Sequence, residues 1–507
     1  MTKNIHAYTC FYPEQTHTWR VPVKTNTAPH RIFSWIVLHP KRIILLSMML
    51  IVAAALFIPN MTKDTRADAF LAEDNPALLY REKVKSMFGL SDPVVVAVVS
   101  DDSIFTVDGL NTIQRITNAV LEVANIDPEG VTSLATENNI VGTEEGMAVD
   151  PFYDDGLVTK ATANLVKIAI RNFPLYQGSL VAHDESASLV VIEFIDESLA
   201  EQTYQDVVHT VESLTLPRGI HVHIAGEGAI SGYLGSYIDA DAQRLNPMAG
   251  LIITIIVFIA FLRFASILTA NLIIGASVLI TIGVMTAMGV PFYVITNALP
   301  VILIGIAVAD SLHIYSEYFE RRAHNPEESI NDSIIASMNA MWRPVTLTTL
   351  TTIAGFLGLY FAAYMPPFKY FGLFTAIGVA IAWLYSMTFL PAAMSLLKTE
   401  AHPRLRHKIQ TQGHDAFASI MVGLGKFTQN NAKFVIASSA IVAVAGFYFA
   451  SQLLVNEDRI NTFHPTEALY IADKEINTRF DGSNYLDIVI ETKTEDTSGL
   501  LLSIVTW

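Results

Sequence analysis

The sequence contains a single cysteine, Cys10, among 507 residues. One thiol cannot form a disulfide within the chain or a cysteine-ligated zinc or iron–sulfur centre, so we expect neither. Charged residues are also scarce, at 16% of the chain, whereas soluble domains contain about 25%. Hydrophobic residues make up 51% of the chain. These proportions argue against an ordinary soluble enzyme.

Several motifs of catalytic and nucleotide-binding proteins are missing. The sequence has no GxxxxGK[ST] phosphate-binding loop, and this absence argues against ATP-driven transport. It has no cluster of His and carboxylates with metal-binding spacing and no nucleophile motif after a strand, so we predict no enzymatic activity, no metal and no cofactor. The net charge of −16 argues against a nucleic-acid partner, whose phosphates require a basic surface.

Long apolar runs dominate the remainder of the chain. Seven of them approach the roughly 20 residues that cross a bilayer as a helix, which predicts a multi-span α-helical membrane protein. The first run has no small-residue cleavage pattern after it, so we interpret it as a retained helix and not as a signal peptide. The runs are Ile43–Ile58, Met248–Leu262, Ile267–Val290, Tyr293–Ile314, Val345–Tyr364, Phe371–Leu397 and Phe434–Leu454.

Basic residues predict the orientation. They are frequent in the N-terminal segment 1–42, in the stretch 316–343 and in the linker 398–433, which the positive-inside rule places in the cytoplasm. The short loops on the other side contain only Lys369 among Lys and Arg. We therefore expect a multi-pass protein of the plasma membrane, the inner membrane of a bacterium, with a cytoplasmic N-terminus and spans 2 to 6 within residues 246–397.

Residues 60–245 form an acidic segment with 29 Asp plus Glu against 11 Lys plus Arg. A long loop is translocated largely regardless of its charge, so this segment is predicted to be periplasmic or extracellular. Strand and helix patterns alternate in it, which predicts a small α/β sandwich of the βαββαβ, ferredoxin-like kind. The expected elements are strands at 93–99, 131–135, 189–195 and 220–225, helices at 108–125 and 199–214, and an inserted helix at 158–171.

The chain contains an internal repeat. Features that follow the first span recur after the seventh, so residues 456–507 are expected to begin a second external domain. That domain would be incomplete at Trp507, as in a fragment or a truncated product. The matching pairs are Arg66 and Arg459, Phe70 and Phe463, and Phe88 and Phe480, at offsets of 393, 393 and 392.

Asp310 is the only Asp, Glu, Lys or Arg within the seven runs, and His313 is the only histidine. A charged side chain in hydrocarbon costs about 2.5 to 3.5 kcal/mol on insertion scales, so such an acid marks a candidate functional site. A desolvated carboxyl group could take up and release a proton near neutral pH. His313 shares the helical face of Asp310. The alternative is that Asp310 only hydrogen-bonds to neighbouring helices and that His313 faces water.

Hydroxyl groups near the start of the fifth span are candidate proton relays. Thr348, Thr349 and Thr352 could pass a proton to or from a facing carboxyl group, although threonines in membrane helices usually bond the carbonyl one turn back. Small residues in the fifth and sixth spans predict close helix packing. These are Gly355, Gly358, Gly372, Ala376 and Ala380. The charged stretch between the fourth and fifth spans predicts either a helix lying on the membrane surface over residues 316–338 or a solvated connector.

Two motifs resemble the resistance-nodulation-division (RND) superfamily. One is GIAVADSLHI at Gly305–Ile314, which is similar to the glycine-led motif of that superfamily's fourth span. The other is RPVTLTTLTTIAGF, which begins at Arg343 and is similar to the start of its fifth span. The order of one span, an external α/β domain and five more spans also resembles one half of such a protein.

The short external domain is similar to that of the hydrophobe exporters related to the mycobacterial large membrane proteins, which implies a porter domain. The resemblance also implies export of a lipid-like or amphipathic molecule from the bilayer, driven by protons, and is compatible with a homo-oligomer or accessory proteins. The chain departs from the family pattern at Ala309, where many relatives have an acid. Asp310 corresponds to the second position of that acidic pair, and the proton stoichiometry is open.

Two other functions are compatible with a proton-coupled or lipid-binding bundle. One is a protein-translocation accessory of the SecD and SecF kind, against which the seventh span and the second repeat argue. The other is a lipid sensor of the sterol-sensing class that does not transport. Proton dependence separates a transporter from a sensor.

Overall fold

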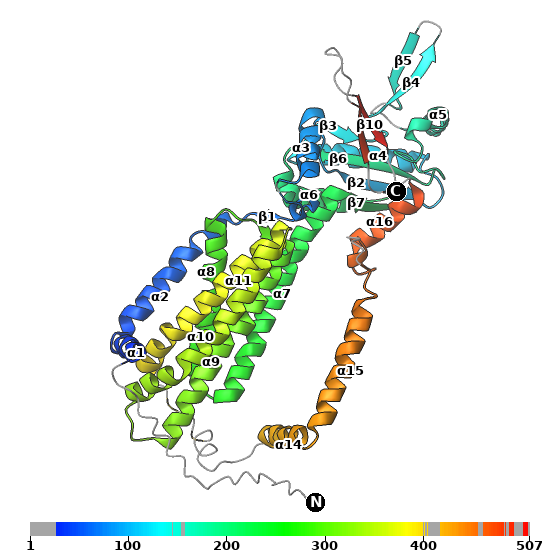
Figure 1. Cartoon of the computed structure of the whole chain (residues 1–507). Helices are drawn as coiled ribbons and strands as arrows, with labels where there is room; N and C mark the ends of the chain where they lie inside the picture. The colour runs from blue at the N-terminus through cyan, green and yellow to red at the C-terminus, as the bar shows by residue number, and fades with distance from the viewer. Residues whose placement is uncertain are drawn as a thin grey trace, which may run out of the picture.

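The computed structural model describes residues 27–72, 74–143, 146–153, 158–398, 400, 403, 416–454, 460–480, 482, 486–490 and 500–504. A bundle of long helices forms one end of the molecule, and a domain of strands and shorter helices forms the other (Figure 1). The expectations for residues 1–26, for 404–415 of the linker and for Arg459 lie outside the described residues.

The described chain contains seven helices that are long and apolar enough to cross a membrane, as the sequence predicts. The protein is therefore a multi-pass helical membrane protein. The first span is α2, and the sixth is α11 continued by α12. The spanning helices are α2 (Pro40–Ala55), α7 (Glu227–Phe261), α8 (Phe264–Ala287), α9 (Ala298–His324), α10 (Ile330–Ala362), α11 (Pro366–Met387), α12 (Phe389–Leu397) and α15 (Ala432–Ala450).

Helix α7 is longer than the sequence predicts. It begins at Glu227 and not at Met248, and it follows β7 (Ile220–Ala225), the last strand of the four-stranded sheet. Hydropathy detects only the apolar part of a helix, and the residues before Met248 are polar or mixed. One continuous helix therefore joins the sheet to the bundle.

The charged stretch between α9 and α10 forms no separate helix, so the predicted surface helix over residues 316–338 is wrong. Helix α9 continues to His324, and α10 begins at Ile330. Ser329 caps α10 because its hydroxyl accepts the backbone N–H of Asp332 at 3.1 Å. Arg321 pairs with Glu328 at 2.7 Å across the turn. Arg321 and Glu328, two of the charged residues that suggested a surface helix, thus stabilise a short turn between two spans.

Helices α8, α9 and α11 pack against one another, and α2 packs on the outer side of α8. Close approach depends on small residues. A Cβ added at Gly283 of α8 would lie 2.3 Å from the carbonyl oxygen of Ala54 at the end of α2. No real Cβ sits that close to a backbone atom, so α2 and α8 must separate when a side chain is added.

We expect Gly283→Ala to lower the free energy of unfolding by about 1 to 3 kcal/mol, because overpacking forces the two backbones apart. Gly275 lies in the same helix, and an added Cβ there meets nothing within 4 Å. Gly275→Ala is therefore a matched control, and it is expected to be neutral or to stabilise the helix by up to about 1 kcal/mol. Thermal unfolding of both variants in detergent measures the difference, and equal effects would contradict the contact.

The small residues of the fifth and sixth spans divide into two groups. Gly372 of α11 is in tight contact, since a Cβ there would lie 2.7 Å from the carbonyl oxygen of Phe356 on α10. Gly355 and Gly358 are exposed, and an added Cβ would meet nothing within 4 Å among the described residues. The predicted packing role is therefore confirmed for Gly372 and wrong for Gly355 and Gly358, which face away from α11.

The domain of strands and shorter helices, which the sequence predicts to be external and which is called the external domain below, is built on a four-stranded antiparallel sheet. The strand order is β3-β6-β2-β7. Two helices, α4 and α6, connect its strands. Strand β3 ends at Thr132, although the sequence predicts a strand at 131–135. The elements are β2 (Val94–Ser100), α4 (Val107–Leu121), β3 (Ile126–Thr132), β6 (Ala187–Phe194) and α6 (Ala200–Glu212), followed by β7.

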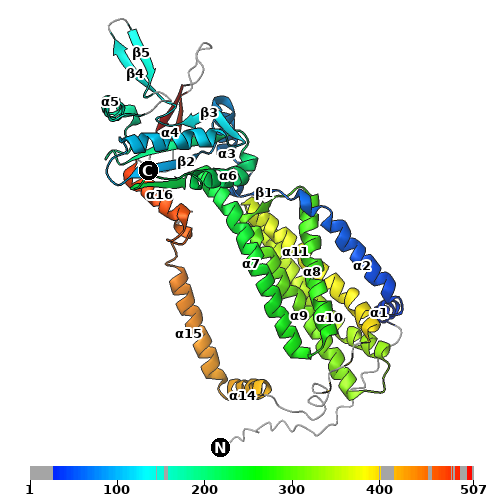
Figure 2. The ribbon, with the colours of Figure 1, turned by 180° about the vertical axis from the view of Figure 1, so that it is seen from behind.

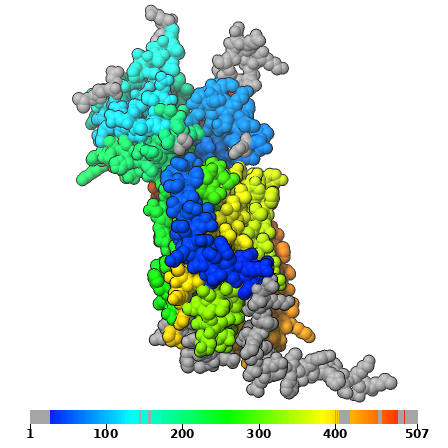
Figure 3. Space-filling view, turned by 90° about the vertical axis from the view of Figure 1, so that its left-hand side faces the viewer, coloured from blue at the N-terminus to red at the C-terminus, as the bar shows by residue number. Residues whose placement is uncertain are grey.

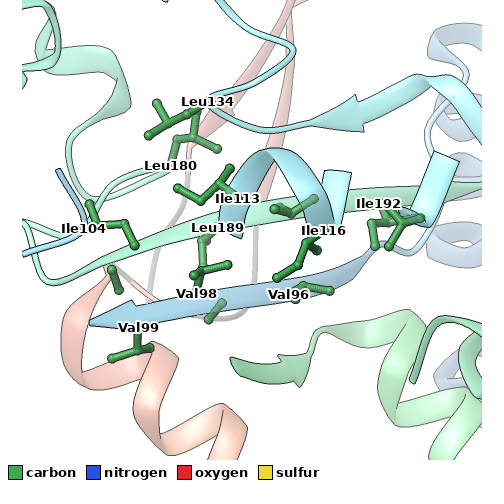
Figure 4. Packing of buried hydrophobic residues seen from close by; sticks show 14 of the residues in the cluster. Val96, Val98, Val99, Ile104, Ile113, Ile116, Leu134, Leu180, Leu189 and Ile192 are labelled. Atoms are coloured by element: carbon green, nitrogen blue, oxygen red, sulfur yellow. The ribbon is translucent and has the colours of Figure 1, made fainter. Parts of the chain in front are cut away.

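Helix α4 covers one face of the sheet. Its apolar residues Ile113 and Ile116 are fully buried, as are Val96 and Val98 of β2 (Figure 4). Valine and isoleucine suit a strand because their branched side chains pack well on a pleated surface. The side-chain hydroxyl of Thr106 accepts the N–H of Gly109 at 3.0 Å and caps the helix. Helix α4 thus packs on β2, the strand that precedes it in the chain.

Some elements were not predicted. A hairpin of β4 (Asn138–Thr143) and β5 (Gly146–Pro151) projects from the end of the domain far from the bundle (Figure 1). Helix α3 (Pro76–Phe88) precedes the sheet, and Asn75 caps it by accepting the N–H of Ala77 at 2.9 Å. The expected inserted helix is α5 (Lys160–Asn172).

Helix α16 (Ala468–Arg479) covers the opposite face of the sheet (Figure 2). It comes from a distant part of the chain, because it lies 234 or more residues after Tyr233 of α7. Its residues Leu469, Ala472 and Ile476 are at most 2% exposed and belong to the same apolar core as the sheet. Tyr233 of α7 also donates a hydrogen bond to the carboxylate of Glu467. Helix α16, which follows the seventh span, therefore packs in the core of the first external domain.

Ion pairs fasten the external domain to the bundle where the chain leaves α2. The ammonium of Lys63 lies 3.2 Å from the carboxylate of Glu201 on α6 and 2.7 Å from that of Asp239 on α7. Lys63 also belongs to β1 (Lys63–Asp64), which pairs in parallel with β8 (Phe292–Tyr293) before α9. This junction connects the first span, the sheet and the loop that leads into the fourth span.

Candidate intramembrane site

Asp310 lies near the middle of α9, twelve residues after Ala298, which is about 18 Å along the helix axis at 1.5 Å per residue. The residues before it are apolar, so the chain folds here as a membrane helix and carries the acid into the hydrocarbon region. Its immediate helical neighbours differ in exposure. Ala307 and Ser311 are buried in the bundle, whereas Ala309 is exposed. Asp310 is half-buried, at the edge between these two sides.

Thr349 of α10 is the predicted hydroxyl that meets this acid. Its side chain is buried and lies next to Asp310 at the interface of α9 and α10. The Thr349 hydroxyl also lies 2.8 Å from the carbonyl oxygen of Val345, one turn back. A hydroxyl has one hydrogen and two acceptor lone pairs, so it cannot donate to both oxygens at once.

This arrangement is sensitive to the charge of Asp310. When the carboxyl group is protonated, it donates to Thr349, whose own hydrogen stays on the Val345 carbonyl. When the group is ionised, it has only acceptor oxygens, and Thr349 must turn its hydrogen toward them. A charge-assisted hydrogen bond is stronger than a neutral one, so the turned hydroxyl stabilises the anion.

The other two threonines do not reach Asp310 in this structure. Thr348 is exposed, and the backbone carbonyl oxygens of Pro344 and Val345, either of which can accept its hydroxyl hydrogen, lie 3.1 and 2.9 Å away. Thr352 donates to the carbonyl of Thr348 at 3.0 Å. Both threonines therefore bond to a carbonyl one turn back in their own helix, as threonines in membrane helices usually do. This is the alternative to a proton relay that the sequence left open.

His313 is exposed, and no hydrogen bond or ion pair joins it to Asp310 among the described residues. It continues a row with Gly305 and Ala309, at intervals of four residues, and all three are exposed. This row is the side of α9 that no other described element covers. Asp310 therefore lies between the bundle interior, where Thr349 is, and an open face that carries small residues and one imidazole.

A group of buried hydroxyls behind α9 was missed by the sequence analysis. Tyr315 is fully buried, and its hydroxyl lies 2.6 Å from that of Thr269 on α8. Ser277 of α8 donates to the carbonyl of Gly378 on α11 at 2.9 Å. Tyr315 follows Asp310 by five residues, so helical spacing alone does not place the two side chains on one face. Only the packing of α8 against α9 identifies this polar group.

Comparison with known proteins identifies a family and several relatives that this chain resembles. A family model described as the MMPL family matches residues 108–425, which is more than half of the chain. The hopanoid transporter HpnN of Burkholderia multivorans is 27% identical over 201 residues, or 38% of this chain and 22% of HpnN. The siderophore exporter MmpL5 of Mycobacterium tuberculosis is 24% identical over 269 residues, or 50% and 27% of the two chains. The matched part spans about a quarter of the length of these relatives.

Proposed function

Because this chain belongs to the MMPL family, we propose that it is a secondary transporter of the RND type that exports hydrophobic or lipid-like molecules against proton influx. Asp310 is the proton-carrying group. The observation that carries this assignment is the position of Asp310, half-buried in α9 beside the buried Thr349 of α10. The names of two relatives, a hopanoid transporter and a siderophore exporter, support an amphipathic substrate.

The mechanism couples the charge of Asp310 to the packing of α9 and α10. A neutral carboxyl group tolerates hydrocarbon, whereas an ionised one requires the Thr349 hydroxyl or water. Proton binding and release therefore favour two different arrangements of the bundle. One charge that crosses 100 mV supplies about 2.3 kcal/mol, equal to about a 50-fold bias between two states. His313 lies on the open face of α9 beside Asp310, whereas Thr348 and Thr352 are bonded within α10 and take no part in this step.

The external domain acts as a porter domain of the ferredoxin-like type in this proposal. The strand order β3-β6-β2-β7, with a helix after the first and third strands in chain order, supports that assignment. Helix α7 runs without a break from the sheet into the bundle, so a change in bundle packing reaches the domain directly. The basic segments at the other end of the bundle support an external location for residues 60–245.

Dye accumulation in an efflux-deficient bacterial host tests the transport function. Cells that express the chain are expected to accumulate less of the lipophilic dye Nile red than cells with an empty vector. A protonophore should remove this difference within minutes, because the proton gradient supplies the energy. A lipid sensor without transport would leave dye accumulation unchanged before and after the protonophore, and that result would contradict the proposal.

A further inference from the structure

Helix α1 (Ala28–Leu38) lies in the half of the bundle away from the sheet and runs crosswise to α2, which begins at Pro40 (Figure 3). One side of α1 packs on the bundle through the buried residues Phe33, Ile36 and Val37. The other side is also apolar. Its residues Ile32, Trp35 and Leu38 are 57%, 51% and 69% exposed.

The exposed side of α1 continues the lipid-facing surface of α2. Leu45 and Leu46, one to two turns into α2, are 71% and 58% exposed, as expected of side chains that face hydrocarbon. Trp35 stacks on His39, with ring centroids 5.2 Å apart, at the junction of the two helices. Tryptophan is enriched at the boundary between bilayer and water, where its ring has an apolar body and a polar tip.

The charges around α1 have one sign. Arg31, Lys41 and Arg42 are exposed, and residues 27–62 contain no Asp or Glu. A cluster of cations at the depth where a span leaves the hydrocarbon is complementary to the anionic headgroups of phospholipids. Apolar side chains that dip below such cations are the pattern of an interfacial helix.

A short helix that runs crosswise before a span, like α1 before α2, occurs a second time in the chain. Helix α14 (Ala416–Asn430) runs crosswise at the lower end of α15 (Figures 1 and 2). Lys433 follows Lys41 by 392 residues, the offset that also separates Phe480 from Phe88. Residues 416–454 contain no Asp or Glu. The exposed side chains of this second copy are Ile420, Met421, Leu424, Lys426, Phe427 and Lys433.

We propose that α1 and α14 are equivalent interfacial helices of the two repeats. Each binds the headgroups of anionic phospholipids, α1 next to the first span and α14 next to the seventh. Lys41 and Arg42 hold the phosphates at α1, and Lys426 and Lys433 hold them at α14. Trp35 and its apolar neighbours enter the acyl region beside them. This binding requires no proton gradient, so it is separable from the transport function.

The test uses the full chain in nanodiscs that contain either brominated phosphatidylglycerol or brominated phosphatidylcholine. The part of the fluorescence quenching that disappears in Trp35→Phe reports on lipid at α1. We expect stronger quenching by the anionic lipid. Each Lys or Arg near an anionic surface contributes a factor of about 5, so the double variant Lys41→Gln/Arg42→Gln should lower that preference by 5- to about 30-fold.

Two controls accompany this variant. Lys83→Gln/Lys160→Gln removes two exposed positive charges from the external domain and should leave the preference unchanged. Lys426→Gln/Lys433→Gln should lower the number of phosphatidylglycerol molecules retained in native mass spectra while leaving the Trp35 signal intact. Raising NaCl from 0.05 to 0.5 M should weaken the preference in the unmodified chain, because exposed charges are screened.

Three results would overturn the proposal. Trp35 quenching by neither lipid would mean that protein, and not bilayer, covers α1. Equal quenching by both lipids in the unmodified chain would mean that α1 is anchored only by its apolar side chains. A preference that withstands both high salt and the loss of Lys41 and Arg42 would place the anionic site elsewhere.

Discussion

Asp310→Asn is expected to abolish gradient-driven transport, with Nile red accumulation returning to the level of the empty vector. Asparagine has nearly the same shape as aspartate and can still hydrogen-bond to Thr349, but it cannot bind or release a proton. A proton that crosses 100 mV supplies about 2.3 kcal/mol, and the variant cannot use this energy. The bias of about 50-fold between the two arrangements of the bundle is therefore lost. Membrane levels of the variant must be compared by immunoblot, so that loss of protein is not mistaken for loss of transport.

Two threonine variants supply matched controls. Thr349→Val removes the hydroxyl beside Asp310, and a hydrogen bond to a charged group is worth about 1.5 to 3 kcal/mol, so transport should fall by about 10- to 160-fold. Thr348→Val removes a neighbouring hydroxyl that bonds only to its own helix and should change transport less than twofold. Equal effects of the two variants, or full activity of Asp310→Asn, would exclude the proposed coupling.

Ile476→Ala is expected to destabilise the external domain by about 2 to 5 kcal/mol, because Ile476 is 1% exposed in the core that α16 forms with the sheet. The loss combines the transfer energy of the removed methyl groups with the cavity that they leave. Hydrogen exchange measures the effect. The amides of β7, against which α16 packs, should exchange faster in the variant.

The same helix provides the control for this prediction. Ile471 is 39% exposed, so Ile471→Ala deletes the same atoms from a position with far fewer neighbours. It should change the exchange of β7 little, with a loss of stability below about 1 kcal/mol. If both isoleucine variants affected β7 equally, α16 would not be part of the domain core.

The polar site illustrates where sequence reasoning succeeds and where it stops. Asp310 is evident from the sequence because a single charge in seven apolar runs is visible without any knowledge of packing. The selection of Thr349 from three neighbouring threonines is not, since it depends on how α10 is rotated about its axis against α9. A rotation of about 100° separates adjacent helix residues, so Thr348 faces outward while Thr349 is buried.

The sequence by itself determined the spans and most of the sheet, because hydrophobic run length and strand alternation are local properties that each segment carries alone. Tertiary structure decided everything that depends on contact between distant segments. It extended α7 and α9 beyond their apolar runs, placed Gly283 against Ala54, and brought α16 onto a sheet formed more than 200 residues earlier. These outcomes depend on which surfaces pack together when apolar area is buried. The hydrophobic pattern of one segment does not show which other segment will pack against it.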